Sequence, residues 1–218
     1  MAHTLRYGAD DAPARALAAA DPALGAVIDR VGSIEFGPFG EPFEVLAHSI
    51  VSQQLAGAAA ARIWARFREQ IGVTPEAVAA ASDEQLRAVG LSGRKAEYVH
   101  GLAIAALERD PDLDVLAALS DDEVVERLTA LRGIGPWTAH MFLMFGLQRP
   151  DVLALDDYGI RLAVGRLQGL GGPASPAQVA EAAERWRPYR SVALLYLWKG
   201  GDTPAEPAPV PIPEGDPR

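Results

Sequence analysis

The chain has 218 residues and a formal net charge of −9, and its 49% hydrophobic and 22% charged residues are typical of a globular protein. It contains no cysteine, which excludes disulfides, thiolate zinc sites and cysteine-bound iron–sulfur clusters. No uncharged apolar run reaches about 18 residues and the N-terminus lacks a signal-peptide pattern, so we expect no membrane segment and a cytoplasmic protein.

The charge is distributed unevenly along the chain. Residues 1–126 carry 20 acidic residues against ten Lys or Arg, whereas residues 127–199 carry five against nine. Contact with a polyanion depends on local charge within about 8–10 Å. The negative total therefore does not exclude nucleic acid as a partner, although chance clustering would explain the same distribution.

Apolar residues recur at helical spacing along most of the chain. Phe43, Leu46 and Ile50 begin the first clear stripe, and Ser120 starts a helix that ends at Gly133. In the helix predicted over 94–109, the inward side is expected to include Val99 and Leu107. Further helices are predicted over 136–147, 157–168, 176–186 and 189–199. Alternating strand patterns are scarce, so the sequence predicts an all-α fold.

The stretch L-R-G-I-G-P-W-T-A, residues 131–139, lies between two predicted helices. A glycine can take a positive φ, and Pro136 suits the first position of the next helix. Free backbone amides at such a helix start form an anion site. The sequence therefore predicts a phosphate contact, and the alternative is a tight turn between packed helices. The predicted contacts are the amides of Ile134 and Gly135, the turn at Gly133, the hydroxyl of Thr138 and the charge of Arg132.

Two adjacent acids, Asp156 and Asp157, precede the helix predicted over 157–168. One of them can cap that helix with its carboxylate. The pattern leaves open whether either acid does more than this.

Three segments together resemble one protein family. They are S-I-V-S-Q-Q-L (49–55), L-R-G-I-G-P-W-T-A (131–139) with L-D-D-Y-G-I-R (155–161), and R-W-R-P-Y-R-S-V-A-L-L-Y-L-W (185–198). In order and spacing they resemble the helix–hairpin–helix (HhH-GPD) DNA glycosylases, and within these the 3-methyladenine DNA glycosylase II (AlkA/Mag-type) branch. The resemblance covers roughly residues 40–200.

The resemblance implies a catalytic role for Asp157. Lyase members of the family carry a lysine where this chain has Trp137, so a Schiff-base step would lack its nucleophile. Met141 stands where a relative has a tyrosine, which leaves the substrate range open. The implied base pocket consists of Trp137, Met141, Tyr158 and Trp198.

The resemblance also implies a wedge that fills the gap left by a flipped base. It falls on Gln54, with Gln53 and Leu55 as the neighbouring candidates. A monovalent cation, Na⁺ or K⁺, is implied at the hairpin carbonyls of Leu131 and Gly133, and no other cofactor is expected. We expect no metal bound by side chains, because no second ligand stands at metal spacing from a histidine.

The resemblance implies two helical subdomains with the active cleft between them. Residues 45–148 would form a helical barrel ending in the hairpin, residues 1–44 with 149–200 the second subdomain, and residues 201–218 a flexible Pro-rich acidic tail. The implied function is that of a monomeric, monofunctional glycosylase that removes alkylated bases such as 3-methyladenine and 7-methylguanine from duplex DNA. The alternatives are a glycosylase for another lesion, such as uracil, hypoxanthine, ethenoadenine or an oxidised purine, and a non-catalytic DNA-binding protein.

Overall fold

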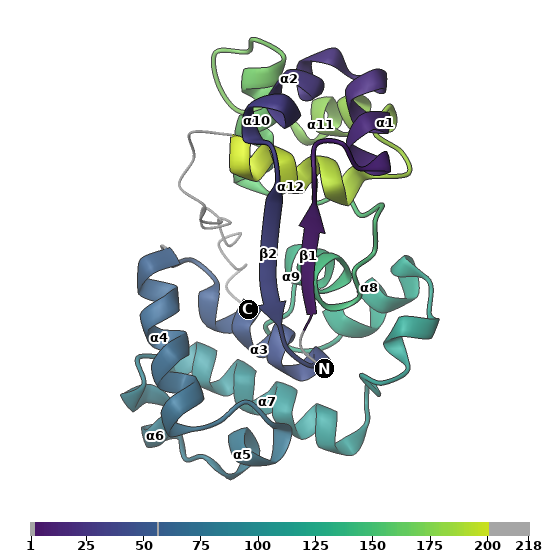
Figure 1. Ribbon diagram of the computed structural model, residues 1–218. Coiled ribbons are helices and arrows are strands. Elements are labelled where there is room, and N and C mark those ends of the chain that lie inside the picture. The colour runs from purple at the N-terminus through teal and green to yellow at the C-terminus, as the bar shows by residue number, and fades with distance from the viewer. Residues whose placement is uncertain (1–2, 56, 201–218) are drawn as a thin grey trace.

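The computed structural model describes residues 3–55 and 57–200, and most of these residues are helical (Figure 1). The all-α prediction is confirmed, although the helix predicted over 136–147 consists of α9 and a π-helical turn, η2 (Phe142–Gly146). A 3₁₀ turn, η1, covers Leu116–Ala118. The α-helices are α1 (Ala12–Ala20), α2 (Pro22–Val31), α3 (Pro42–Ser52), α4 (Gly57–Gln70), α5 (Pro75–Ala80), α6 (Asp83–Ala88), α7 (Gly93–Glu108), α8 (Asp121–Thr129), α9 (Pro136–Met141), α10 (Tyr158–Leu167), α11 (Pro176–Glu184) and α12 (Arg190–Gly200).

The helices form two groups, one above the other in Figure 1. Helices α1, α2, α10, α11 and α12 pack together in the upper group, and helices α3 to α9 pack together in the lower group. The first and last described segments therefore meet in one group, while the middle of the chain forms the other. The domain boundaries implied at 44/45 and 148/149 stay a prediction.

Two strands, β1 (His3–Tyr7) and β2 (Ile34–Phe39), run between the two groups as an antiparallel ribbon (Figure 1). Arg6 lies opposite Glu35 in the register, and their side chains form an exposed ion pair at 2.9 Å. The sequence did not predict these strands. They span five and six residues, and a glycine and a proline interrupt the alternation in β2, which weakens a strand pattern.

The cores of both groups are built from the apolar stripes of their helices. Leu46 and Ile50 on α3 are fully buried, as the spacing predicts, and so is Phe67 on α4. Burying one such side chain stabilises the fold by roughly 1.5–3 kcal/mol. The predicted inward position of Leu107 is wrong, because its side chain is 45% exposed. Leu107 lies on the same face as the buried Ala103, but it stands in the last turn of α7, beyond the last buried residue of that helix.

Hydrogen bonds join distant parts of the upper group. The indole of Trp186 donates to the Oδ2 atom of Asp21 at 2.9 Å, and the other carboxylate oxygen of Asp21 caps α2. The hydroxyl of Tyr196 lies 3.3 Å from the carbonyl oxygens of Tyr7 and Gly32, and burial raises the pKa of Tyr196 to about 12. These contacts fix α12, and the segment between α11 and α12 that holds Trp186, against the helices and strands that come first in the chain.

His48 on α3 gives the fold a predicted pH dependence. Its ring meets the ring of Trp64 edge-on at 5.0 Å, and burial, with a smaller contribution from Arg68, lowers the pKa of His48 below its ordinary value of 6.5. Below about pH 6.5 the unfolded chain takes up a proton that the folded chain resists, so stability falls as the pH falls. We expect urea midpoints to drop from pH 7.5 to 5.5, and to drop less in His48→Gln. Equal drops in both proteins would contradict this role of His48.

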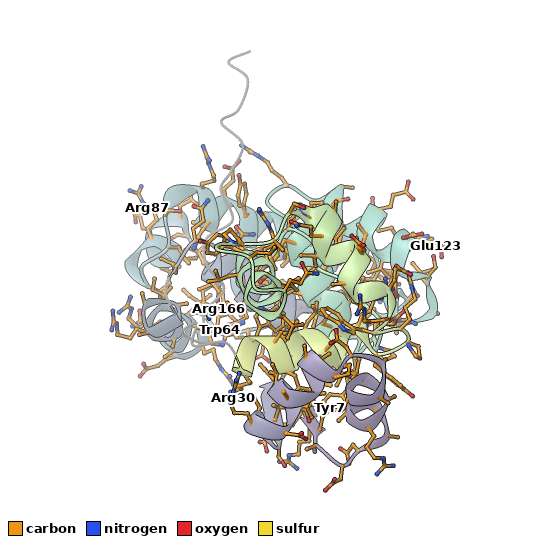
Figure 2. The ribbon with its side chains drawn as sticks, turned by 90° about the horizontal axis from the view of Figure 1, so that it is seen from above. Tyr7, Arg30, Trp64, Arg87, Glu123 and Arg166 are labelled. Atoms are coloured by element: carbon orange, nitrogen blue, oxygen red, sulfur yellow. The ribbon has the colours of Figure 1, made fainter. Side chains whose placement is uncertain are left out.

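Surface charge and polarity dominate the periphery of the molecule. Figure 2 shows Arg87 and Glu123 at opposite margins, pointing outward. Within residues 3–55 and 57–200, no helix is both long and apolar enough to cross a bilayer. The predicted Pro-rich tail, residues 201–218, lies outside the described residues.

Candidate active site

Helices α8 and α9 are joined by a hairpin, residues 130–135, that depends on one glycine. Ser120 starts α8 with a capping box, in which it exchanges hydrogen bonds with Glu123. Gly133 has a φ of +90°, and a Cβ atom added there would lie 2.2 Å from Cγ of Tyr98. Only glycine fits this position, because both the backbone angle and the contact with Tyr98 exclude a side chain. Pro136 then occupies the first turn of α9, as the sequence predicts.

The start of α9 presents three backbone N–H groups without a partner among the described residues. They belong to Gly135, Trp137 and Thr138. A Cβ atom added at Gly135 would meet nothing within 4 Å, so this side of the hairpin is open to a ligand. Unpaired N–H groups at a helix start attract anions.

Two details of the predicted phosphate site are corrected by the structure. The N–H of Ile134 donates to the carbonyl of Leu131 at 3.1 Å, so it closes the turn and does not point outward. Thr138 is only 2% exposed, and its hydroxyl lies 3.3 Å from the side-chain nitrogen of Gln53. Only the backbone N–H of Thr138 therefore remains free for an anion.

Arg132 lies exposed beside the hairpin. Its guanidinium forms an ion pair with Glu97 and lies 5.9 Å from the ring centre of Tyr98. Exposed ion pairs contribute little to stability. The pair between Arg132 and Glu97 can therefore separate when Arg132 binds a phosphate group. The position of Arg132 is therefore compatible with its predicted phosphate contact.

Asp157 lies 1% exposed at the start of α10, where it receives three hydrogen bonds. Its Oδ1 atom accepts from the N–H of Ile160 at 2.8 Å and from the indole of Trp198 at 3.1 Å, and its Oδ2 atom accepts from the indole of Trp137 at 2.8 Å. All three partners are donors, and an ionised carboxylate is an acceptor only. The hairpin, α10 and α12 thus converge on one carboxylate, whereas Asp156 is exposed.

The loop that leads to Asp157 is fixed to the start of α12. Arg190 donates to both carboxylate oxygens of Asp151, at 2.8 and 2.9 Å, in the bidentate geometry that makes such pairs strong. Ser191 donates through its hydroxyl to the carbonyl of Arg149 at 2.6 Å and accepts from the N–H of Val152 at 2.9 Å. Helix α12 therefore anchors this loop at one end and holds the carboxylate through Trp198 near its other end.

The predicted pocket residues differ in their exposure. Trp137 and Trp198 are half-buried on either side of Asp157, and Tyr158 is 40% exposed. Met141, the last residue of α9, is only 5% exposed and belongs to the hydrophobic core. Sequence reasoning missed Phe145, whose ring stacks on Trp198 with centroids 6.0 Å apart. Its position in the π-helical turn η2 is not predictable from a helical pattern.

The three wedge candidates occupy different environments in the turn after α3. Gln54 is exposed and has a φ of +56°, whereas Leu55 is half-buried. Gln53 is turned into the protein, where its Nε2 atom donates to the carbonyl of Gly133 at 2.9 Å. Of the two glutamines, only Gln54 therefore has a free side chain on the surface.

The carbonyls predicted to hold a cation each accept a hydrogen bond already. Leu131 accepts from the N–H of Ile134, and Gly133 accepts from Gln53. A carbonyl oxygen has two lone pairs, so the cation stays a prediction. In the described part of the chain, no cluster of three or more His, Cys, Asp or Glu residues could hold a metal ion.

Comparisons with known proteins agree with this geometry. The family model of the HhH-GPD superfamily base excision DNA repair proteins matches residues 47–188. The chain belongs to this superfamily. DNA-3-methyladenine glycosylase 1 of Schizosaccharomyces pombe is 37% identical over 164 residues, which cover 73% of this chain and 72% of the relative.

Two solved structures share the HhH-GPD fold of this chain over most of its length. The DNA-3-methyladenine glycosidase of Bacillus halodurans superposes with a TM-score of 0.79 at 34% identity, covering 94% of this chain and 97% of the other. The 3-methyladenine DNA glycosylase of Schizosaccharomyces pombe, in complex with abasic DNA, superposes with a TM-score of 0.78 at 32% identity. The match covers 87% of this chain and 96% of the other. The predicted membership of the 3-methyladenine glycosylase branch is thereby confirmed.

Lyase members of the HhH-GPD family carry a lysine where this chain has Trp137. In the structure, the indole of Trp137 donates a hydrogen bond to Asp157. The indole of Trp137 cannot act as an amine nucleophile, and lysine is present only at residues 95 and 199. Neither lysine contacts Asp157 in the structure. The site can therefore supply a charge and aromatic side chains, but no Schiff base.

Proposed function

We propose that this chain is a monofunctional DNA glycosylase that hydrolyses the N-glycosidic bond of alkylated bases in duplex DNA. The observation that carries the proposal is the buried carboxylate of Asp157, held by two indole N–H groups at a helix start beside an open hairpin. The names of the relatives, DNA-3-methyladenine glycosylases, agree with this activity.

The reaction would use the charge of Asp157. Cleavage of the glycosidic bond develops positive charge on the sugar, and a nearby ionised carboxylate stabilises that charge. An ionised carboxylate has about four lone-pair positions, and three of them accept hydrogen bonds here. The remaining position, on Oδ2, accepts no hydrogen bond from the described residues and would serve the sugar or the attacking water.

The leaving base needs little acid from the protein. A purine alkylated at a ring nitrogen already carries a positive charge, so it departs as a neutral molecule. The indole rings of Trp137 and Trp198 border the carboxylate, and an aromatic face attracts a cationic base. The pocket would therefore select bases by charge and shape, with Tyr158 as its exposed wall and the buried Met141 as a further lining residue.

DNA would be held mainly through phosphate. The free N–H groups of Gly135, Trp137 and Thr138 would donate to an oxygen of a DNA phosphate, and Arg132 would add charge. Contacts of this kind make affinity fall steeply with salt. Gln54 would fill the gap left by the flipped base, and a monovalent cation at the carbonyls of Leu131 and Gly133 would strengthen the phosphate site. We propose that the protein acts as a monomer in the cytoplasm.

The substrate is tested with duplexes that each contain one lesion. Incubation should convert 7-methylguanine to an abasic site, which alkali then cleaves, and should leave strands intact without alkali. Cleavage of uracil or hypoxanthine duplexes in preference to alkylated ones would favour the alternative glycosylases. Binding without any cleavage would favour a non-catalytic protein.

A further inference from the structure

The end of α3 is held from one side by a lysine of another helix. The last carbonyls of a helix have no partner within the helix. Here the ammonium group of Lys95, on α7, donates to the carbonyl of Val51 at 2.7 Å and also to the carbonyl of Gln53. Burial removes water from the ammonium of Lys95 and lowers its pKa, and the two carbonyls accept its hydrogen bonds there instead.

The same turn is held from the other side by the hairpin. The side-chain nitrogen of Gln53 donates to the carbonyl of Gly133 at 2.9 Å and lies 3.3 Å from the hydroxyl oxygen of Thr138. Gly133 precedes the free N–H groups that we assign to phosphate, and Thr138 carries the last of them. Gln53 therefore contacts Lys95 through its backbone and the phosphate hairpin through its side chain.

Gln54, the next residue, is exposed and has a φ of +56°. A residue other than glycine is uncommon in the left-handed region and stays there when its surroundings determine the backbone. Gln53 precedes it directly, and the N–H of Leu55 follows with a bond to the carbonyl of Ser52 at 3.2 Å. The contacts of Lys95 and Gln53 therefore lie directly before Gln54, in the turn that the N–H of Leu55 closes.

We propose that Gln53 and Lys95 are positioning residues, which hold Gln54 at a fixed place relative to the hairpin, so that docking of a phosphate brings the wedge into the base stack. The inference rests on the proposed function for its kinetic readout. It adds to that function a structural connection between the phosphate site and the wedge. The side chain of Gln53 makes this connection through its contacts with Gly133 and Thr138.

A defect in positioning the wedge has a distinctive dependence on the substrate. Flipping costs energy to break the pair and the stack, and this cost is smaller when the base is unpaired. A poorly placed wedge should therefore slow excision of a paired lesion much more than excision of an unpaired one. A defect in chemistry or in general folding should slow both equally.

The kinetic experiment uses 7-methylguanine opposite cytosine and opposite an abasic spacer. Because Gln53 loses two contacts, we expect Gln53→Ala to lower the single-turnover rate about tenfold opposite cytosine and less than about threefold opposite the spacer. Lys95→Met should behave in the same way, and Lys95→Arg should recover most of the rate because a guanidinium can also donate to two carbonyls. Equal losses on both duplexes, or no loss, would overturn the inference.

Matched controls change one exposed glutamine and one exposed basic residue on other helices. Gln70→Ala changes an exposed glutamine at the end of α4, and Arg87→Met changes an exposed cation on α6 that points away from the molecule (Figure 2). Both should leave the two rates unchanged. Thermal unfolding of every variant shows whether Lys95→Met folds, and Gln53→Ala decides the question if it does not.

A second measurement does not depend on catalysis. A duplex with a tetrahydrofuran abasic analogue and a neighbouring 2-aminopurine reports unstacking by the wedge as a rise in fluorescence. Gln53→Ala should lose more than half of this rise while its affinity stays within about threefold of the wild type. A full rise in the variant would overturn the inference. If the wild type excised no base, the proposed function would fail, and this fluorescence would still decide the role of Gln53.

Discussion

Replacing Asp157 by Asn should lower the single-turnover rate of 7-methylguanine excision by about 10³-fold, because the charge that stabilises the sugar cation disappears. The amide also faces three donors, the indoles of Trp137 and Trp198 and the N–H of Ile160, so its NH₂ group must point at one of them. The rate is measured with enzyme in excess over a duplex that carries one lesion.

The exposed neighbour supplies the matched control for this change. Asp156→Asn removes the same charge one residue away and should keep the rate within about threefold of the wild type. Asp157→Asn should still bind a duplex with an abasic analogue, since the hairpin is unchanged. A loss of less than about tenfold in Asp157→Asn would show that the carboxylate is not the main source of catalysis.

Replacing Gly133 by Ala should disrupt the hairpin and with it DNA binding. The added methyl group would lie 2.2 Å from Cγ of Tyr98, at a φ of +90° that alanine rarely adopts. We expect a loss of about 2–4 kcal/mol in the free energy of unfolding, from the overlap and from the backbone strain together. We also expect DNA affinity to fall by tenfold or more, about the effect of losing one or two good hydrogen bonds. Urea unfolding and a binding titration measure the two effects.

Two other glycines separate stability from binding. Gly135→Ala has space for its methyl group and a negative φ of −97°, so the fold should keep its stability while the methyl group obstructs the phosphate. Gly101→Ala, inside α7, also meets nothing within 4 Å and should leave affinity unchanged. If Gly133→Ala bound DNA as well as Gly101→Ala does, the hairpin would not be the phosphate site.

The sequence predicts those parts of the site that local patterns determine. Gly133 and Pro136 predict the hairpin, because each has a backbone conformation that few other residues can adopt. The sequence predicts that one of the adjacent acids Asp156 and Asp157 caps the helix, and the structure shows that it is Asp157, whose catalytic role is implied by the family resemblance. These residues lie where the sequence predicts them, since each acts within a few positions of its own place in the chain.

Contacts between distant segments are the part that the sequence does not predict. The bond from Gln53 to Gly133 joins residues 80 positions apart, and the same turn receives Lys95 from α7. The stacking of Phe145 on Trp198 depends on a π-helical turn and on the packing of α12. The bond of the Ile134 amide to Leu131 follows from how tightly the hairpin closes, which composition alone does not fix.

The most direct test of the central claim is to identify the bases that the wild type and Asp157→Asn release from randomly methylated duplex DNA. The account predicts free 3-methyladenine and 7-methylguanine from the wild type, almost none from Asp157→Asn, and strands that break only after alkali. Binding of the DNA by the wild type without release of a free base, or equal release by both proteins, would contradict it.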